Sequence, residues 1–191
     1  MAKGILSAAA LFLVLSFQPA ETGKWTMDKA HSKLRFTISH LTVSEVDGWF
    51  RDFDIKLNSS KDDFSDAVVE ATINVNSIDT DNEQRDKHLL SADFFDAAKY
   101  PTITFKSKGL KKTEDKKYIL SGDLTMHGVT KPIEVAVAGM TITHPQTKKT
   151  VAGFKAVTKV KRSDFGIGES FGNATVGDEV TITANLEFIK D

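Results

Sequence analysis

Three residues that could carry chemistry stand close together in one short segment, Arg85, Asp86 and His88. A histidine titrates near neutral pH, and a neighbouring carboxylate and guanidinium can share in proton transfer or bind a polar group. We interpret the group as an acid–base or ion-pair cluster at the mouth of a cavity. The alternative is a salt bridge that caps a helix, with a histidine that hydrogen-bonds the end of a strand. If the cluster acts on a ligand, we expect it to gate or orient a polar head group, and we predict no catalytic residue.

Other motifs with familiar chemistry are incomplete. No two of the five histidines have the spacing of a zinc motif, and there is no cysteine to complete one. The stretch GIGESFG does not match the spacing of either phosphate-binding glycine loop, and no Gly-x-Ser-x-Gly elbow occurs. We therefore expect a glycine-rich bend there, and neither a metal nor a cofactor in the protein. The histidines are His31, His40, His88, His127 and His144.

Arg162 and Asp164 directly precede the glycine-rich bend. They could pair with each other or with the cluster at Arg85, and Arg162 is also a candidate to face a ligand.

The charge balance excludes several kinds of partner. The chain of 191 residues has 25 basic and 26 acidic residues, and its formal net charge is −1. A nucleic-acid-binding protein usually has a basic face, so we expect no nucleic acid partner. With 40% hydrophobic residues, one domain with a sizeable core is the simplest expectation.

The N-terminal residues 1–20 resemble a secretory signal peptide. Lys3 precedes an apolar stretch from Gly4 to Phe17, which is shorter than the roughly 20 residues that a membrane-spanning helix needs. No later segment is apolar enough to span a bilayer. We expect residues 21–191 to form a single soluble domain that a bacterium exports to its periplasm or secretes.

Most of the remaining chain alternates between apolar and polar residues. In SKLRFTISH, for example, Leu34, Phe36 and Ile38 fall on one face and the residues between them on the other. A period of two with one polar face is typical of antiparallel strands that are solvated on one side. About eight such runs, with no covering layer of helices, predict an all-β fold, either a sandwich or a closed barrel. A barrel of this size has an interior that side chains fill or that holds one small ligand.

The alternation fails between residues 79 and 98. There the spacing of Arg85, Leu89 and Leu90 is helical, and Ser91 followed by Asp93 indicates the start of a second short turn. We expect one or two short helices over one opening of the barrel, with Phe94 and Phe95 packed inward. This segment, residues 81–98, is the predicted cap.

Four blocks of sequence in order resemble the YceI family: DKAHSKLRFTISHLTVSEVDGWFRDF, NEQRDKHLLSADFFDAAKYPTITF, GDLTMHGVTKPIEV and RSDFGIG. The resemblance extends from about Trp25 to Phe188. It implies an exported bacterial protein with a lipocalin-like antiparallel β-barrel of about eight strands. It also implies that the barrel holds a polyisoprenoid or similar long lipid, with the cap over its mouth.

Together these observations predict an exported carrier for one long apolar lipid chain, and not an enzyme. One alternative is a small hydrolase or isomerase that acts on a lipid through Arg85, Asp86 and His88. Another is an interaction protein without a ligand, whose barrel is filled by its own side chains. Self-association as a homodimer is left open. The expected ligand-binding residues are Phe36, Ile38, Phe53, Ile73, Val75, Arg85, His88, Phe94, Phe95, Phe105, Leu124, Met126, Phe154 and Arg162.

Overall fold

A computed structural model of the chain describes residues 23–191. The signal-peptide prediction, residues 1–20, lies outside the described residues. The strands are β1 (Lys24–Met27), β2 (Lys33–His40), β3 (Ser44–Phe50), β4 (Phe53–Asn58), β5 (Val68–Asn74), β6 (Ile78–Asp79), β7 (Thr102–Glu114), β8 (Lys117–Met126), β9 (Val129–Thr143), β10 (Thr150–Lys161) and β11 (Val176–Lys190). The helices are α1 (Glu83–Leu90) and two 3₁₀ turns, η1 (Val75–Ser77) and η2 (Arg162–Phe165).

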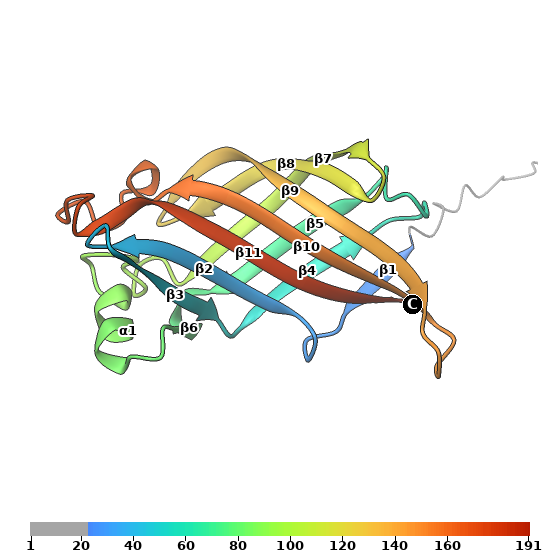
Figure 1. The fold of residues 1–191 in the computed structure, drawn as a ribbon, viewed down its shortest axis with the longest axis horizontal. Coiled ribbons are helices and arrows are strands. Elements are labelled where there is room, and N and C mark those ends of the chain that lie inside the picture. The colour runs from blue at the N-terminus through green and yellow to red at the C-terminus, as the bar shows by residue number, and fades with distance from the viewer. Residues whose placement is uncertain (1–22) are drawn as a thin grey trace, which may run out of the picture.

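The strands form a closed antiparallel barrel. Hydrogen-bonded neighbours follow the order β1-β4-β5-β7-β8-β9-β10-β11, and β11 pairs again with β1 to close this ring of eight. The long strand β11 changes partner along its length: its last residues pair with β1, and its residues 176–185 pair with β2. The strands β2, β3 and β6 therefore continue the wall at one end of the barrel (Figure 1). The predicted all-β barrel is confirmed.

One end of the barrel is closed by packed aromatic side chains, here called the plug. Trp25 packs against Phe64, with ring centroids 5.3 Å apart, and Phe64 meets Phe154 edge-to-face at 5.1 Å. Phe154 in turn contacts Phe188 at 6.1 Å. Trp25, Phe64 and Phe188 are all buried. This end of the barrel is therefore solid core.

The opposite end of the barrel carries α1, the loop that follows η2, and the turn between β2 and β3 (Figure 1). Asn82 caps α1 by accepting a hydrogen bond from the Arg85 backbone N–H at 3.0 Å, and Ser91 ends the helix. Residues 92–99 form turns, so the cap contains one α-helix and no second one. None of the helices in residues 23–191 is long and apolar enough to cross a membrane.

Candidate functional site: an apolar cavity under the cap

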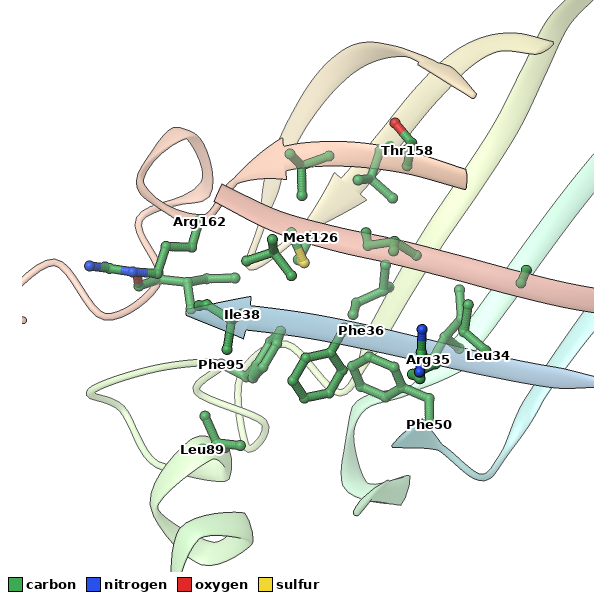
Figure 2. A pocket seen from close by; sticks show the side chains of 18 of the residues that line it. Leu34, Arg35, Phe36, Ile38, Phe50, Leu89, Phe95, Met126, Thr158 and Arg162 are labelled. Atoms are coloured by element: carbon green, nitrogen blue, oxygen red, sulfur yellow. The ribbon is translucent and has the colours of Figure 1, made fainter. Parts of the chain in front are cut away.

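A cavity of about 470 Å³ lies inside the barrel at the end that carries α1 (Figure 2). Its wall consists mainly of inward-facing apolar side chains from the strands, including Phe36, Ile38, Val180 and Ile182. These side chains are only partly buried although they point into the barrel. Their remaining accessible surface faces the cavity, so this half of the barrel is hollow. The volume falls within the range of about 300–1,000 Å³ that is usual for small-molecule sites.

Two cross-strand pairs of glycine and phenylalanine keep space open in the wall. Gly48 lies directly opposite Phe36 in the β2–β3 ladder, and a Cβ at Gly48 would meet the Phe36 ring at 2.2 Å. A Cβ at Gly122 of β8 would likewise meet the Phe105 ring of β7 at 2.4 Å. The outer edge of each ring thus occupies the space that a side chain at the glycine of the neighbouring strand would need.

Most of the predicted ligand-binding residues line this cavity. They come from the strands, from the cap and from the start of η2, and whether they bind a ligand stays a prediction. The lining residues among them are Phe36, Ile38, Ile73, Arg85, His88, Phe94, Phe95, Phe105, Leu124, Met126 and Arg162.

Three predicted residues do not line the cavity. Phe154 belongs to the plug, where it packs between Phe64 and Phe188. Phe53 begins β4 and Val75 lies in η1, and both are buried in the packed core. Alternation along a strand assigns a residue to the inner face but does not give its depth along the barrel axis. The placement of Phe53, Val75 and Phe154 in the lining was therefore wrong.

The cap closes part of the mouth with aromatic side chains. Phe95 projects into the cavity, where its ring meets the Phe50 ring edge-to-face at 6.1 Å. Phe94 is buried and lies against Gly168, at which a Cβ would meet the ring at 2.8 Å. Leu89 of α1 also lines the cavity (Figure 2). The cap is thus packed onto the barrel by its inward apolar groups, as the sequence predicts.

Arg85 and Asp86 meet at a third residue, Thr80, instead of pairing with each other. Arg85 donates from Nε to the Thr80 hydroxyl at 2.7 Å and from Nη2 to the Thr80 carbonyl at 2.6 Å. Asp86 accepts from the Thr80 backbone N–H at 2.9 Å and from its hydroxyl at 2.5 Å. Thr80 is almost fully buried, so these bonds fix the start of the cap to the barrel. Asp86 is not among the residues that line the cavity.

His88 lies apart from that pair, at the rim of the mouth. Its Nε2 is 3.4 Å from an Asp93 carboxylate oxygen, and its ring contacts Phe94 and Phe171 edge-on at 5.0 and 5.7 Å. The side chain is about half exposed. The three groups of the proposed acid–base set therefore do not converge on one point in this structure. What the arrangement offers is a positive group and an imidazole beside an apolar cavity.

Arg162 is buried at the mouth and is fully engaged by the protein backbone. Its guanidinium donates to the carbonyls of Ile167, Gly168, Phe171, Val176 and Gly177 at 2.6–3.0 Å. It makes no ion pair with a carboxylate of residues 23–191, so neither of the possible pairings, with Asp164 or with the Arg85 cluster, forms. A guanidinium has five N–H donors, and all five are used here. Arg162 lines the cavity, and its guanidinium holds the glycine-rich bend in shape.

Some lining residues were missed by the sequence reasoning. Phe50 and Val46 lie on β3, a strand whose alternation is hidden because Gly48 stands at one of its inward positions. Phe171 comes from the loop after η2, where no periodicity gives a side chain its direction. The polar residues at the mouth, Ser39 and His40 among them, were also not predicted.

Three side chains at the plugged end could offer ligand atoms to a metal ion. The atoms of Asp28, His31 and Glu187 lie within 4.8 Å of one another. Asp28 already accepts a hydrogen bond from the His31 ring at 2.9 Å, and this bond raises the pKa of His31. A raised pKa favours the imidazolium, which cannot bind a metal. Asp28 and His31 lie in the turn between β1 and β2, and Glu187 lies beside them on β11, away from the cavity.

Comparisons with known proteins agree with this architecture. The sequence model for the family described as "YceI-like domain" matches residues 25–188. Protein YceI of Escherichia coli O157:H7 is 37% identical over 194 residues, which cover 100% of this chain and 99% of that protein. The crystal structure of BcnA from Burkholderia cenocepacia superposes with a TM-score of 0.75 at 26% identity, covering 84% of this chain and 98% of that one.

A more distant structure shares the fold alone. It is described as a polyisoprenoid binding domain from Saccharophagus degradans implicated in plant cell wall breakdown. The TM-score is 0.64 at 18% identity, over 89% of this chain and 99% of that one.

Proposed function

This chain belongs to the YceI-like family, and from that premise we propose that it is a carrier that holds one long apolar lipid chain, a polyisoprenoid or a similar lipid, inside its barrel. The observation that carries the proposal is the cavity of about 470 Å³ with an almost entirely apolar wall. A distant relative of the same fold is described as a polyisoprenoid binding domain, which agrees with this class of ligand.

Burial of the chain supplies the binding energy. Each methylene removed from water contributes about 0.8 kcal/mol, so 15 buried carbons would contribute on the order of 12 kcal/mol before the costs of association. Several kcal/mol are lost when the ligand is immobilised. A dissociation constant that is micromolar or tighter is therefore reasonable. No catalytic group is needed for this function.

The polar residues at the mouth would orient the head group. Arg85 donates its Nε–H and one N–H of Nη2 to Thr80. Its other N–H groups have no partner among residues 23–191. His88, half exposed at the rim, could donate to the same group. A head group with acceptor oxygens, such as a hydroxyl, a quinone or a phosphate, fits this pair of side chains.

We place the carrier outside the cytoplasm of a bacterium, in the periplasm or secreted. The support is the resemblance of residues 1–20 to a secretory signal peptide. An exported carrier would move or store a lipid that is insoluble in the aqueous compartment.

The direct test is native mass spectrometry of the protein purified from its own host, followed by organic extraction of the bound molecule. A lipid released at about one equivalent per chain, with a hydrocarbon tail, supports the proposal. A protein that remains empty after incubation with polyprenols and fatty lipids of several lengths would overturn it. Conversion of the added lipid to a product would indicate an enzyme instead.

A further inference from the structure

The turn between β2 and β3 carries apolar side chains into solvent. Leu41 is 50% exposed and Val43 is 82% exposed, the largest exposed fraction among the large hydrophobic residues of the described chain. Residues 41–43 are called the tip below. Scattered exposed hydrophobic side chains are common on protein surfaces, so exposure alone means little. The conformation and the position of the tip give it significance.

The tip adopts a backbone that its residues disfavour. Val43 N–H donates to the His40 carbonyl at 3.2 Å, and the two residues between them have positive φ, 51° at Leu41 and 58° at Thr42. This is the φ signature of a type I′ turn, in which Asn and Gly are strongly preferred. A β-branched threonine in this region of φ is strained. The chain thus places Leu and Thr where Asn-Gly would stabilise the turn, and strain of this kind often marks a functional position.

The tip stands directly beside the mouth of the cavity. His40, which precedes it, lines the cavity, and so does Thr175, whose carbonyl accepts a hydrogen bond from Leu41 N–H at 3.0 Å. The apolar surface of the tip is therefore next to the apolar wall. A lipid tail that leaves a membrane beside the tip would have a short path into the cavity.

The size and the charge of the surroundings indicate what the tip contacts. A stable protein–protein interface needs about 800 Å² on each partner, far more than three residues provide. The segments around the mouth, residues 39–45, 83–96 and 166–176, contain six carboxylates and two cationic side chains. An acidic rim repels an anionic surface but does not hinder contact with a neutral one. The carboxylates are Glu45, Glu83, Asp86, Asp93, Asp96 and Glu169, and the cations Arg85 and Lys87.

We propose that the tip, Leu41–Thr42–Val43, inserts shallowly and reversibly into a neutral lipid bilayer and so sets the mouth of the cavity against the membrane that donates the ligand. The inference rests on the proposed lipid-carrier function and adds the membrane as its loading partner. Contact is apolar, so it tolerates salt. Because only two large side chains take part, it is weak and transient.

The test uses the triple variant Leu41→Asn, Thr42→Gly, Val43→Thr. Asn-Gly suits a type I′ turn, so this variant should fold and melt at the wild-type temperature or above it. Its control, Met140→Ser with Ile142→Ser, removes two side chains of similar exposure, 52% and 49%, from β9 near the plugged end. Flotation with phosphatidylcholine vesicles and transfer of a fluorescent polyprenol from those vesicles are measured for each protein.

For the triple variant we expect the fraction that floats with vesicles and the amount of polyprenol extracted both to fall at least about fivefold below wild type. The β9 control should behave as wild type. Vesicles that contain phosphatidylglycerol should bind wild type more weakly at low salt. Polyprenol supplied in detergent micelles should load the triple variant and wild type equally. Equal loading would show that the cavity of the variant still binds the lipid, so that weaker extraction from vesicles is due to the tip. Equal extraction from vesicles by the triple variant and wild type overturns the proposal. It is also overturned if the triple variant instead loses a dimer detected by light scattering.

Discussion

The rings of Phe94 and Phe171 lie stacked across the mouth of the cavity, with centroids 4.9 Å apart and planes inclined by 24°. Phe94 belongs to the cap, and Phe171 belongs to the loop that Arg162 holds through the Phe171 carbonyl. The stack therefore ties together two segments that are far apart in the sequence. An aromatic pair of this kind is worth about 0.5–1.5 kcal/mol beyond the area it buries. A contact of that strength can break and re-form while a ligand passes.

If the protein holds a lipid as proposed, Phe171→Ala should speed the release of that lipid. Loss of the stack lowers the barrier to opening, so we expect release of a bound polyprenol to accelerate by about three- to tenfold, the equivalent of roughly 0.7–1.4 kcal/mol. Stopped-flow measurement with a fluorescent polyprenol checks the rate. Phe171→Tyr keeps the ring and should release the lipid at the wild-type rate. A wild-type rate in the alanine variant would show that the stack does not limit release.

Phe95→Asp should abolish lipid retention and leave the barrel folded. The side chain lines the cavity, so a carboxylate there would face the tail of the ligand, and burying an unpaired charge is costly. We expect at least a tenfold loss of occupancy, about 1.4 kcal/mol, by native mass spectrometry. The control is Phe154→Leu in the plug, which should lower the melting temperature but leave the occupancy of the folded protein unchanged. Equal occupancy in Phe95→Asp and wild type would contradict the role of the cap.

Arg162→Met should destabilise the loop of residues 166–176 at the mouth of the cavity. The substitution leaves several carbonyl groups of residues 166–177 without a donor, and a buried polar group without a partner costs about 1–3 kcal/mol. We expect the free energy of unfolding to fall by about 2–4 kcal/mol and hydrogen exchange to accelerate in residues 166–176. Arg162→Lys offers three donors in place of five and should restore only part of the protection. A loop in Arg162→Met that exchanges as slowly as in wild type would show that the guanidinium is dispensable.

The fold was largely predictable from the sequence, because alternation along the strands indicates antiparallel sheet with one solvated face. Alternation left a sandwich and a barrel open, and the resemblance to the YceI family implied the barrel. The prediction missed β1, of only four residues, and β3, where Gly48 takes an inward position that would otherwise show an apolar side chain. The helical cap was found because its spacing differs from that of the strands around it. Of the one or two short helices expected there, one forms, and the backbone of residues 92–99 turns repeatedly on itself instead of forming another.

The site was less predictable than the fold. Inward phenylalanines are equivalent in the sequence, yet Phe36 lines the cavity while Phe154 fills the plug. What separates them is depth along the barrel axis, which depends on how the strands are staggered around the ring. The hydrogen-bond partners of Arg162 were not predictable for a similar reason. Its partners are backbone carbonyls, and no residue type identifies a carbonyl that will face inward.

Gly48→Ala should reduce the space available to the ligand. A Cβ there would meet the Phe36 ring at 2.2 Å, so the ring must turn toward the cavity. We expect a preference for shorter lipid chains and a loss of stability of about 1–3 kcal/mol, as is usual when extra atoms are forced into packed structure. Gly153→Ala is the control, because a Cβ at that position has no atom within 4 Å. An unchanged distribution of chain lengths in bound lipid would show that Phe36 does not limit the cavity.

The loop beside the plug should give the protein a defined sensitivity to acid. The Asp66 carboxylate accepts hydrogen bonds from the Ser59 hydroxyl at 2.6 Å, from the Ser60 hydroxyl, and from the backbone N–H groups of Ser60 and Lys61 at 3.0 and 3.3 Å. These hydrogen bonds hold the pKa of Asp66 well below its ordinary value, and the bond from the Ser59 hydroxyl has the largest effect. Ser59 is buried, and its carbonyl accepts a hydrogen bond from the Trp25 ring at 3.3 Å. The charge of Asp66 therefore supports the plug.

A carboxyl whose pKa is lower in the folded state stabilises the fold above its unfolded pKa of about 3.9, and that stabilisation is lost as the pH falls through the folded value. Asp66→Asn should thus lower the free energy of unfolding by about 1 kcal/mol at pH 7, the scale of one or two partly exposed hydrogen bonds. Urea unfolding from pH 7 to pH 2.5 checks this. The gap between variant and wild type should stay constant above pH 5 and narrow below about pH 4. A gap that remained constant down to pH 2.5 would mean that the charge of Asp66 contributes nothing to the stability of the plug.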